Sequence, residues 1–349
     1  MTRLRMQDRS TTRPLPTQPA GPRMPMVHSM WTKVAIFAAL LMVASVPPVA
    51  AGPDRSAVPG TDCSVFPANN VWNMDVSNLP RSSQNRTWKR AMHASSTLLH
   101  PDFGPPAYGI PFDVVDGSHP TVSVDFAYDG ESDPGPYPFG PDISIEGGSD
   151  RHAIMVDADT CTLYELYAAR WNDGAPTAGS GAVFQLEGAD ANDLRPRGWT
   201  SGDAAGLPIF PGLVRWDEVQ AGVIEHAIRF TVGCTKQRFI WPARHQAGVD
   251  DRRCPPMGAR FRLKAKFDAT GYSTEAKVII EAMQHYGMIV ADNGSDWSFQ
   301  GEVNANWSND LLDELKTIPA SAFVAVDESA CRVSKGSAEF AYGPDCPAP

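Results

Sequence analysis

Proline and glycine interrupt this chain too often for long helices. They number 31 and 29 among 349 residues, about one residue in six. Such a density is high for a helical bundle and ordinary for short strands joined by turns. The chain is 42% hydrophobic and 20% charged, which are values of a protein that can bury a core, so wholesale disorder is excluded. We therefore expect a globular, loop-rich β protein.

Short apolar runs support that expectation. Residues 122–128 alternate apolar and polar side chains with the period of a half-buried strand. Residues 153–156 and 162–168 are β-prone, and the turn formers at 157–159 would join them into a hairpin. We predict a mostly β fold, a β-sandwich or jelly roll with a few helices. Further strands are expected over residues 182–186, 227–232, 260–267 and 288–291.

Helical patterns flank this β-rich region. Residues 84–99 place apolar side chains on one face of a helix. A second helix is predicted from a capping Ser273 to a stop at Gly287, and Ser308 can cap a third, shorter one. The few helices are therefore expected near the N- and C-terminal parts of the domain.

The N-terminal segment has the pattern of an export signal. An apolar run over 34–46 follows Lys33, and small residues at 49–51 suit a signal peptidase site. The alternative is an N-terminal anchor helix, but the run is shorter than the roughly 20 residues that a membrane span needs. We predict a leader and signal peptide over residues 1–51 and a secreted, extracellular protein.

The rest of the chain divides by composition. We predict a linker over 52–62, a single β-rich domain over 63–327 and a C-terminal tail over 328–349. Removing residues 1–51, with six basic and one acidic side chain, changes the formal net charge from −10 to −15. Such a charge disfavours nucleic acid as a partner, because phosphate binding relies on basic patches. We expect a polysaccharide or oligosaccharide ligand, a monomer, and no stable membrane anchor after signal cleavage.

The cysteines agree with export. All six follow the predicted signal, and none forms a C-x-x-C pair. Six cysteines allow fifteen pairings, and a zinc site is the alternative use, although the spacings lack the usual paired ligands. Local closure favours Cys234 with Cys254 and Cys331 with Cys346, which leaves Cys63 with Cys161.

Common catalytic signatures are missing from the sequence. It contains no G-x-S-x-G, H-E-x-x-H, P-loop or G-x-G-x-x-G motif. Their absence argues against lipases, zinc proteases of the zincin type and nucleotide enzymes. Glycosidases and polysaccharide lyases remain, since their carboxylates need only spatial proximity.

One polar cluster is the stretch EGGSDRH that begins at Glu146 and ends at His152. Its glycines allow close backbone approach to a ligand, and its side chains supply acid, base and anion-binding types. The alternative is a hairpin entry in which Asp150 pairs with Arg151. Glu165, on the partner strand, could face His152 or solvent.

A second cluster follows at residues 199–203. Trp199 could stack on a sugar ring, and Asp203 in a glycine-rich loop could act as an acid or base. Alternatively, Ser201 caps a short helix whose first turn contains Asp203. His226 shares the apolar face of its strand, so a core role competes with a catalytic one.

Two basic features complete the candidates. The segment WPARH at 241–245 lies between Cys234 and Cys254, so a disulfide would help to order its Trp, Arg and His side chains as a ligand-contacting loop. The alternating cations of the strand at 260–267 are expected on a solvated outer face, or else on a groove floor that attracts uronate or sulfate groups. They are Arg260, Arg262, Lys264 and Lys266.

Three segments carry a family resemblance. They are PGLVRWDEV at 211–219, WPARH at 241–245 and GMIVADNG at 287–294. Together they resemble a family of secreted bacterial proteins, over a region from about Cys63 to Asp327. The resemblance implies the gross features of carbohydrate-active proteins. It brings no catalytic assignment.

These observations favour a secreted glycoside hydrolase or polysaccharide lyase that acts on an extracellular polysaccharide. A non-catalytic polysaccharide-binding or cell-envelope module is the alternative, followed by a secreted peptidase or esterase. No metal and no cofactor are expected. The candidate catalytic residues are Glu146, His152, Asp203 and His245. The candidate substrate-binding residues are Asp150, Arg151, Trp199, Arg215, Trp241, Arg244, Asp292 and Trp297.

Overall fold

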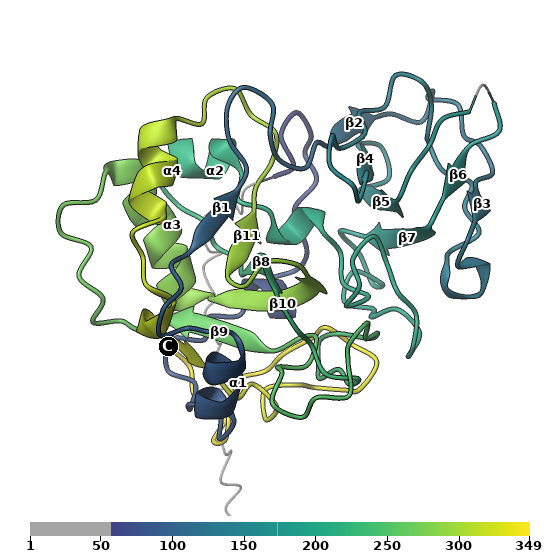
Figure 1. Cartoon of the computed structure of the whole chain (residues 1–349). Coiled ribbons are helices and arrows are strands. Elements are labelled where there is room, and N and C mark those ends of the chain that lie inside the picture. The colour runs from purple at the N-terminus through teal and green to yellow at the C-terminus, as the bar shows by residue number, and fades with distance from the viewer. Residues whose placement is uncertain (1–56, 173) are drawn as a thin grey trace, which may run out of the picture. The chain divides into compact units, whose positions relative to one another are not determined.

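The computed structural model describes residues 57–172 and 174–349, and the predicted leader lies outside these residues. They belong to one compact unit, Ala51–Pro349. Strands dominate and helices are few, so the predicted mostly β fold class is confirmed (Figure 1). Within the described ranges, no helix is both long and apolar enough to cross a membrane.

The larger sheet has six strands in the order β1-β11-β8-β10-β9-β12. The pairs β1/β11 and β8/β10 are parallel, and the other neighbours are antiparallel. The apolar alternation of the sequence predicted several of these strands but not their directions. The strands are β1 (His100–Asp102), β8 (Ile228–Val232), β9 (Arg260–Leu263), β10 (Met288–Asn293), β11 (Ser298–Gln300) and β12 (Phe323–Ala325).

A second sheet has four strands in the order β2-β4-β5-β7. Its β4/β5 pair is the predicted hairpin, and the side chain of Asp157 accepts hydrogen bonds from the backbone N–H groups of Asp159 and Thr160 at the turn. This local bonding explains why the turn could be predicted. The strands are β2 (Asp113–Val115), β4 (Ala153–Asp157), β5 (Thr162–Tyr167) and β7 (Ser180–Gln185).

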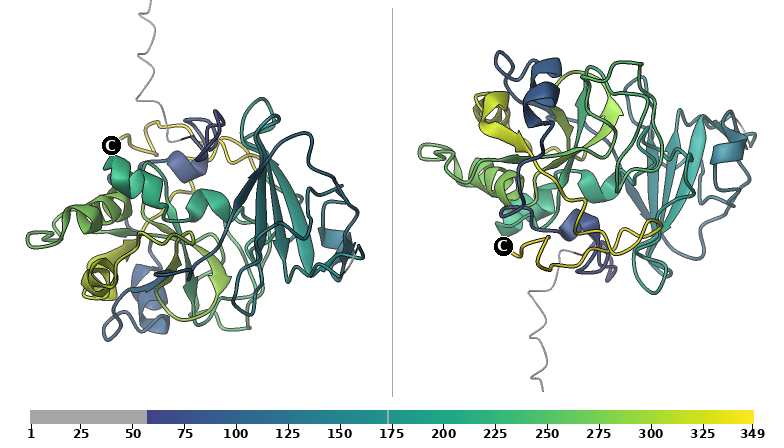
Figure 2. Two further views of the ribbon diagram at one scale, coloured as in Figure 1. Left: turned by 90° about the horizontal axis from the view of Figure 1, so that it is seen from above. Right: turned by 90° about the horizontal axis from the view of Figure 1, so that it is seen from below.

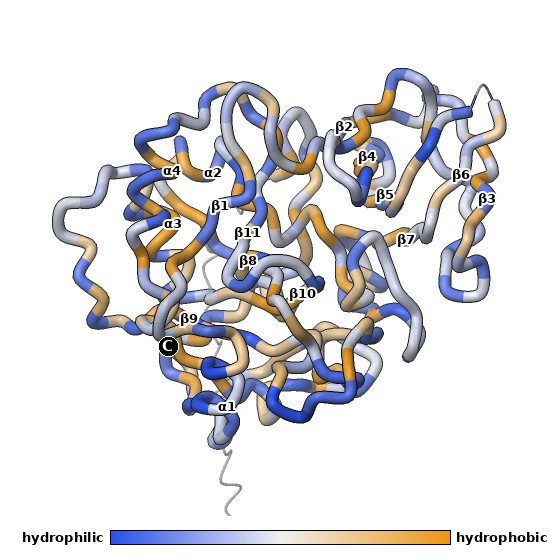
Figure 3. The backbone as a smooth tube through the Cα atoms, viewed as in Figure 1, coloured by the Kyte–Doolittle hydropathy of each residue, from blue (hydrophilic) through white to orange (hydrophobic). Residues whose placement is uncertain are grey.

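The four-stranded sheet is buried on both faces. In β4, Ile154 and Val156 join the main core, whereas Ala153 and Met155 join a second apolar cluster on the opposite face. The continuous apolar run of this strand follows from its two buried faces. Figure 3 shows further apolar chain along β10 and α3, in the region of the larger sheet.

A two-stranded sheet pairs β3 (Asp125–Phe126) with β6 (Thr177–Ala178). The predicted strand at 122–128 is thus much shorter than expected, although Val124 and Phe126 are buried between exposed neighbours. Side-chain alternation reports which face is buried. It does not report how far the hydrogen-bonded ladder continues.

Two predicted helices have the predicted caps. α3 (Thr274–His285) begins after Ser273, whose hydroxyl accepts from the N–H of Ala276, and Gly287 follows with a φ of +69°. α4 (Asn309–Leu315) is capped by Ser308. Figures 1 and 2 show both on the side of the six-stranded sheet away from the four-stranded sheet.

The other two helices depart from expectation. α1 (Asn85–Ala91) is shorter than the predicted 84–99, and His93, just beyond it, has a φ of +50°, which cannot continue a helix. α2 (Trp216–Ala221) was not predicted. It is short, and isolated helices of this length depend on packing rather than on propensity.

Three disulfides join the pairs that local closure favoured: Cys63–Cys161, Cys234–Cys254 and Cys331–Cys346. The segment 328–349, expected as a tail, packs into the main core through Cys331, Ala338, Phe340 and Cys346. It therefore contributes walls and packing to the domain rather than extending away from it.

Candidate functional site

An acidic cavity of about 420 Å³ lies where loops meet the ends of strands from both larger sheets. Asp292 and Asn293 end β10, Tyr167 ends β5 and Ser180 begins β7. The acidic cavity also takes in the loop at 200–204 and the segment at 245–247. Its ionisable lining consists of Glu131, Asp150, Asp203, His245 and Asp292, with Tyr128 and Tyr167 as aromatic walls.

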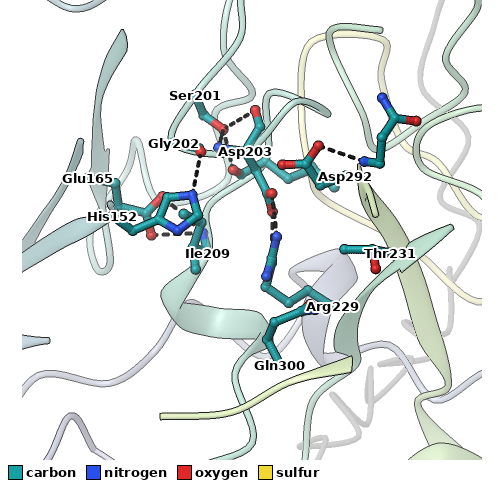
Figure 4. A network of polar contacts seen from close by, with 12 residues as sticks. His152, Glu165, Ser201, Gly202, Asp203, Ile209, Arg229, Thr231, Asp292 and Gln300 are labelled. Atoms are coloured by element: carbon teal, nitrogen blue, oxygen red, sulfur yellow. Dashed lines mark hydrogen bonds and ion pairs between the residues drawn. The ribbon is translucent and has the colours of Figure 1, made fainter. Parts of the chain in front are cut away.

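Asp203 is held in the floor by a buried ion pair. The Nε of Arg229, in β8, donates to Oδ2 of Asp203 at 2.9 Å, and Nη2 donates to Oδ1 (Figure 4). Asp203 is 1% exposed and Arg229 2%. A bidentate pair of this kind fixes the plane of the carboxylate as well as compensating its charge.

The loop that carries Asp203 forms a turn. The Ser201 hydroxyl accepts from the N–H of Asp203 at 2.9 Å and lies 2.5 Å from the carbonyl oxygen of Leu207. The alternative of a helix capped by Ser201 is therefore wrong. Hydroxyl-to-backbone bonds of this type compete with helix formation and favour turns.

Asp292 is the cavity's unusual acid. Burial and the neighbouring Asp203 carboxylate raise the pKa of Asp292 to about 7. Its side chain also accepts from the N–H of Asn293 at 2.6 Å. A carboxyl group with such a pKa still carries its proton near neutral pH, so it can serve as a proton donor.

His245 faces the same cavity with one nitrogen committed. Its Nδ1 donates to the carbonyl oxygen of Ala204 at 2.8 Å, and its Nε2 lies 3.6 Å from Oε2 of Glu131. Because Nδ1–H is bound to a carbonyl, the neutral ring carries its lone pair on Nε2. A basic nitrogen and a protonated carboxyl group therefore line one cavity.

Glu146 and His152 form a pair behind this lining. Nδ1 of His152 lies 2.7 Å from Oε2 of Glu146, and Nε2 lies 3.2 Å from the carbonyl oxygen of Gly202. Burial lowers the pKa of His152, but the hydrogen bond and charge of Glu146 outweigh burial and raise it. Both partners of the ring are hydrogen-bond acceptors, so both ring nitrogens donate. The bond to Gly202 holds the loop that carries Asp203. The ring is 3% exposed and does not line the acidic cavity.

Glu165 is neither exposed to solvent nor hydrogen-bonded to His152. Its fully buried carboxylate accepts from the backbone N–H groups of Ile209, at 2.8 Å, and Phe210, at 2.9 Å. Burial raises its pKa to about 7. These bonds hold the chain where the 3-10 helix Phe210–Gly212 begins.

The other candidates fall into three groups. Asp150 lines the acidic cavity, whereas Trp241 and Arg244 line a separate cavity. Arg151 binds a backbone carbonyl, and Trp199 lies under the guanidinium of Arg195.

Two further candidates lie in the interior. Arg215 pairs with Glu218, which also binds His226, so His226 has the core role. Trp297 is fully buried and donates to the carbonyl oxygen of Met92. A side chain with no exposed surface cannot stack on a sugar, which corrects the role expected for Trp297.

Several residues that line the acidic cavity were not among those predicted from the sequence. Tyr128 and Tyr167 are aromatic walls, and Glu131 is the partner of His245. Tyr128 ends the alternating run at 122–128, and an aromatic side chain at the end of a predicted strand was the available signal. Arg229 lies in β8 between Ile228 and Phe230, and a lone charge in such a run was a signal of a buried ion pair.

No group of three His, Cys, Asp or Glu side chains within 57–172 and 174–349 is arranged to hold a metal ion. The acidic cavity can instead perform proton transfer through Asp292 and His245.

Comparison of the chain with protein-family models, with curated proteins and with solved structures found no match.

Proposed function

We propose that this protein is an exported glycoside hydrolase whose active site is the acidic cavity. The observation that carries the proposal is the pairing of Asp292, with its pKa of about 7, and the lone pair of His245 Nε2 in one cavity. Acid–base cleavage needs a proton donor and a proton acceptor in one site. The walls of Tyr128 and Tyr167 provide surfaces on which sugar rings can pack.

The roles follow from the protonation of the two groups. Nε2 of His245 accepts a proton from a water molecule as the water oxygen bonds to the anomeric carbon. The bond to the glycosidic oxygen breaks, and Asp292 gives that oxygen its proton. Glu131 stabilises the resulting imidazolium, and exchange with solvent restores both groups. The pair formed by Asp203 and Arg229 holds the cavity floor.

Export supports an extracellular substrate. Three disulfides form and persist in oxidising compartments. We expect the exported protein to begin near Gly52, after the predicted signal. Its intact mass checks this, and a membrane fraction that retains residues 34–51 would contradict it.

The test is a panel of glycans assayed for new reducing ends and for absorbance at 235 nm, which reports the unsaturated product of a lyase. Asp292→Asn should lower the rate at least about a hundredfold without lowering the melting temperature. Asp313→Asn, an exposed carboxylate in α4, is the control and should be fully active. Activity should fall as the pH rises above about 7, because Asp292 then loses its proton. Unchanged activity of Asp292→Asn would falsify the assignment.

A polysaccharide-binding module is the second candidate. One observation favours it: the carboxylates of Glu146 and Asp203 are both committed to internal partners, His152 and Arg229. In that case glycans bind the acidic cavity, no reducing ends or unsaturated products form, and Asp292→Asn changes affinity alone.

A further inference from the structure

A second, cationic cavity of about 810 Å³ lies behind the segment 241–244. Its walls come from α1, the start of β9, the chain that follows β12, and residues 332–336. Its five cationic side chains face only two acidic ones, Asp327 and Glu328, although the whole chain carries a formal net charge of −10. The cations are Arg197, Arg244, Arg260, Arg332 and Lys335.

The charges of the outer cations are not neutralised by acidic side chains of the described residues. Within the described part of the chain, Arg197, Arg332 and Lys335 form no ion pair. Nε and Nη1 of Arg244 donate hydrogen bonds to the carbonyl oxygens of Arg195 and Lys335. Burial and the charge of Arg197 lower the pKa of Arg244. Like charges this close repel, and a bound anion would relieve that repulsion.

The floor of the cationic cavity holds a buried ion pair whose carboxylate lacks hydrogen-bond donors in the described chain. Oε2 of Glu328 lies 3.0 Å from Nε of Arg260, yet neither oxygen of Glu328 accepts a hydrogen bond from the described residues. Glu328 is 4% exposed and Arg260 1%. The Nη atoms of Arg260 donate to the carbonyl oxygens of Val71 and Met74. A buried carboxylate without donors is costly, and the attraction of the Arg260 guanidinium offsets part of that cost.

Aromatic side chains complete the cationic cavity. Trp88, Phe239 and Trp241 line it, and the guanidinium of Arg197 lies 4.7 Å from the centroid of the Phe239 ring. Nε1 of Trp88 is buried and has no acceptor among the described residues. The cationic cavity thus offers outer positive charge beside aromatic side chains.

We propose that the cationic cavity binds an acidic saccharide, a sugar chain that carries carboxylate or sulfate groups. The anionic groups contact Arg197, Arg332 and Lys335. Sugar ring faces pack on the aromatic side chains. A simple anion would leave the aromatic side chains unused, and a neutral sugar would leave the outer cations unused.

One short segment connects this binding site with the acidic cavity. Arg244 lines the cationic cavity and the next residue, His245, lines the acidic one. The backbone N–H groups of both donate to the carbonyl oxygen of Ala205, at 2.8 and 3.1 Å. Two consecutive residues of one segment therefore line the two cavities. The binding proposal stands independently of hydrolysis.

The experiment is calorimetric titration of the Asp292→Asn variant, which cannot consume its ligand by the proposed chemistry. The probes are tetragalacturonate, a sulfated chondroitin tetrasaccharide, neutral cellotetraose and inorganic sulfate. At least one acidic tetrasaccharide should bind at least about tenfold more tightly than cellotetraose and sulfate, and added salt should weaken it. Which acidic probe binds identifies the anionic group.

Variants locate the binding. Arg332→Ala combined with Lys335→Ala should weaken binding of the acidic probe about tenfold, because two cations that contact its anionic groups are lost. Both side chains are exposed, so their loss leaves the fold intact. Lys277→Ala combined with Lys316→Ala makes the same charge change elsewhere and should leave affinity unchanged. Equal losses in both double variants, or sulfate binding as tightly as the tetrasaccharides, would overturn the proposal. Failure of hydrolysis alone would leave it standing.

Discussion

Two buried arginine–carboxylate pairs flank the same strand, β10, and they differ in how completely they are satisfied. Arg229, in β8, meets both oxygens of Asp203 through two nitrogens. Arg260, in β9, approaches one oxygen of Glu328 at 3.0 Å, and that carboxylate accepts no hydrogen bond from the described residues. The first pair forms the floor of the acidic cavity and the second that of the cationic cavity. We call the fully hydrogen-bonded pair the closed pair and the incompletely bonded one the open pair.

The largest expected effect comes from breaking the closed pair. Arg229→Leu leaves the carboxylate of Asp203 buried without a counter-charge, which costs about 3–5 kcal/mol of unfolding free energy. Urea unfolding measures the loss. Arg253→Leu removes a guanidinium from an exposed pair with Asp251 and should cause no measurable change. Equal stability of the two variants would contradict the scaffold role of the closed pair.

Removing disulfides should come next. Replacing both Cys234 and Cys254 by Ser opens a loop of sequence separation 20, at about 3 kcal/mol by the chain-entropy estimate. Replacing Cys331 and Cys346 opens a comparable loop of separation 15 and should cost nearly as much. The first loop contains His245 and the second does not. Thus the first variant alone should impair hydrolysis, and equal impairment would show that general loosening is responsible.

Breaking the open pair should cost less and should depend on pH. Burial raises the pKa of Glu328 to about 7, so this carboxyl group can take up a proton when Arg260 is lost. Arg260→Leu should therefore lower stability by about 1–3 kcal/mol at pH 6 and by more at pH 8. Urea unfolding at both pH values is the measurement. If the loss of stability in Arg260→Leu were the same at both pH values, the open pair would behave like the closed pair and the expected difference between them would be contradicted.

The smallest effect concerns pH and the intact protein. The pKa values of Asp292 and Glu328 are raised to about 7, so the folded state holds protons that the unfolded state releases from about pH 4. Stability should then fall as the pH rises from 5 to 8. Asp292→Asn and Glu328→Gln should each reduce that fall by on the order of 1–2 kcal/mol, measured by urea unfolding. If the unfolding free energy of either variant fell more steeply with pH than that of the unmodified protein, the prediction would be contradicted.

Local chemistry explains what the sequence could predict. Ser273 and Ser308 cap their helices, Asp157 shapes its hairpin turn, and nearby cysteines pair, because each depends on residues close in sequence. The strand order of the larger sheet depends on which segments meet across the whole chain. Its parallel pairs, such as β8 with β10, leave no mark on hydrophobic period.

The site was predictable to a similar depth. Asp203, His245, Asp150 and Asp292 are candidates from the sequence that line one cavity. Their separate environments depend on burial and on partners, and the partner of Arg229 lies 26 residues away in the sequence. The expectation of a solvated face for the cations at 260–266 is wrong for Arg260, which is 1% exposed. The alternation identified a shared face without saying what covers it.

The segment that follows β12 contributes to only one of the two cavities. Every lining residue of the acidic cavity lies at or before Asn293. The cationic cavity also needs Arg332, Lys335 and Gly336. These three residues lie inside the loop that Cys331 and Cys346 close, so this one disulfide restrains a wall of the cationic cavity and encloses no lining residue of the acidic one.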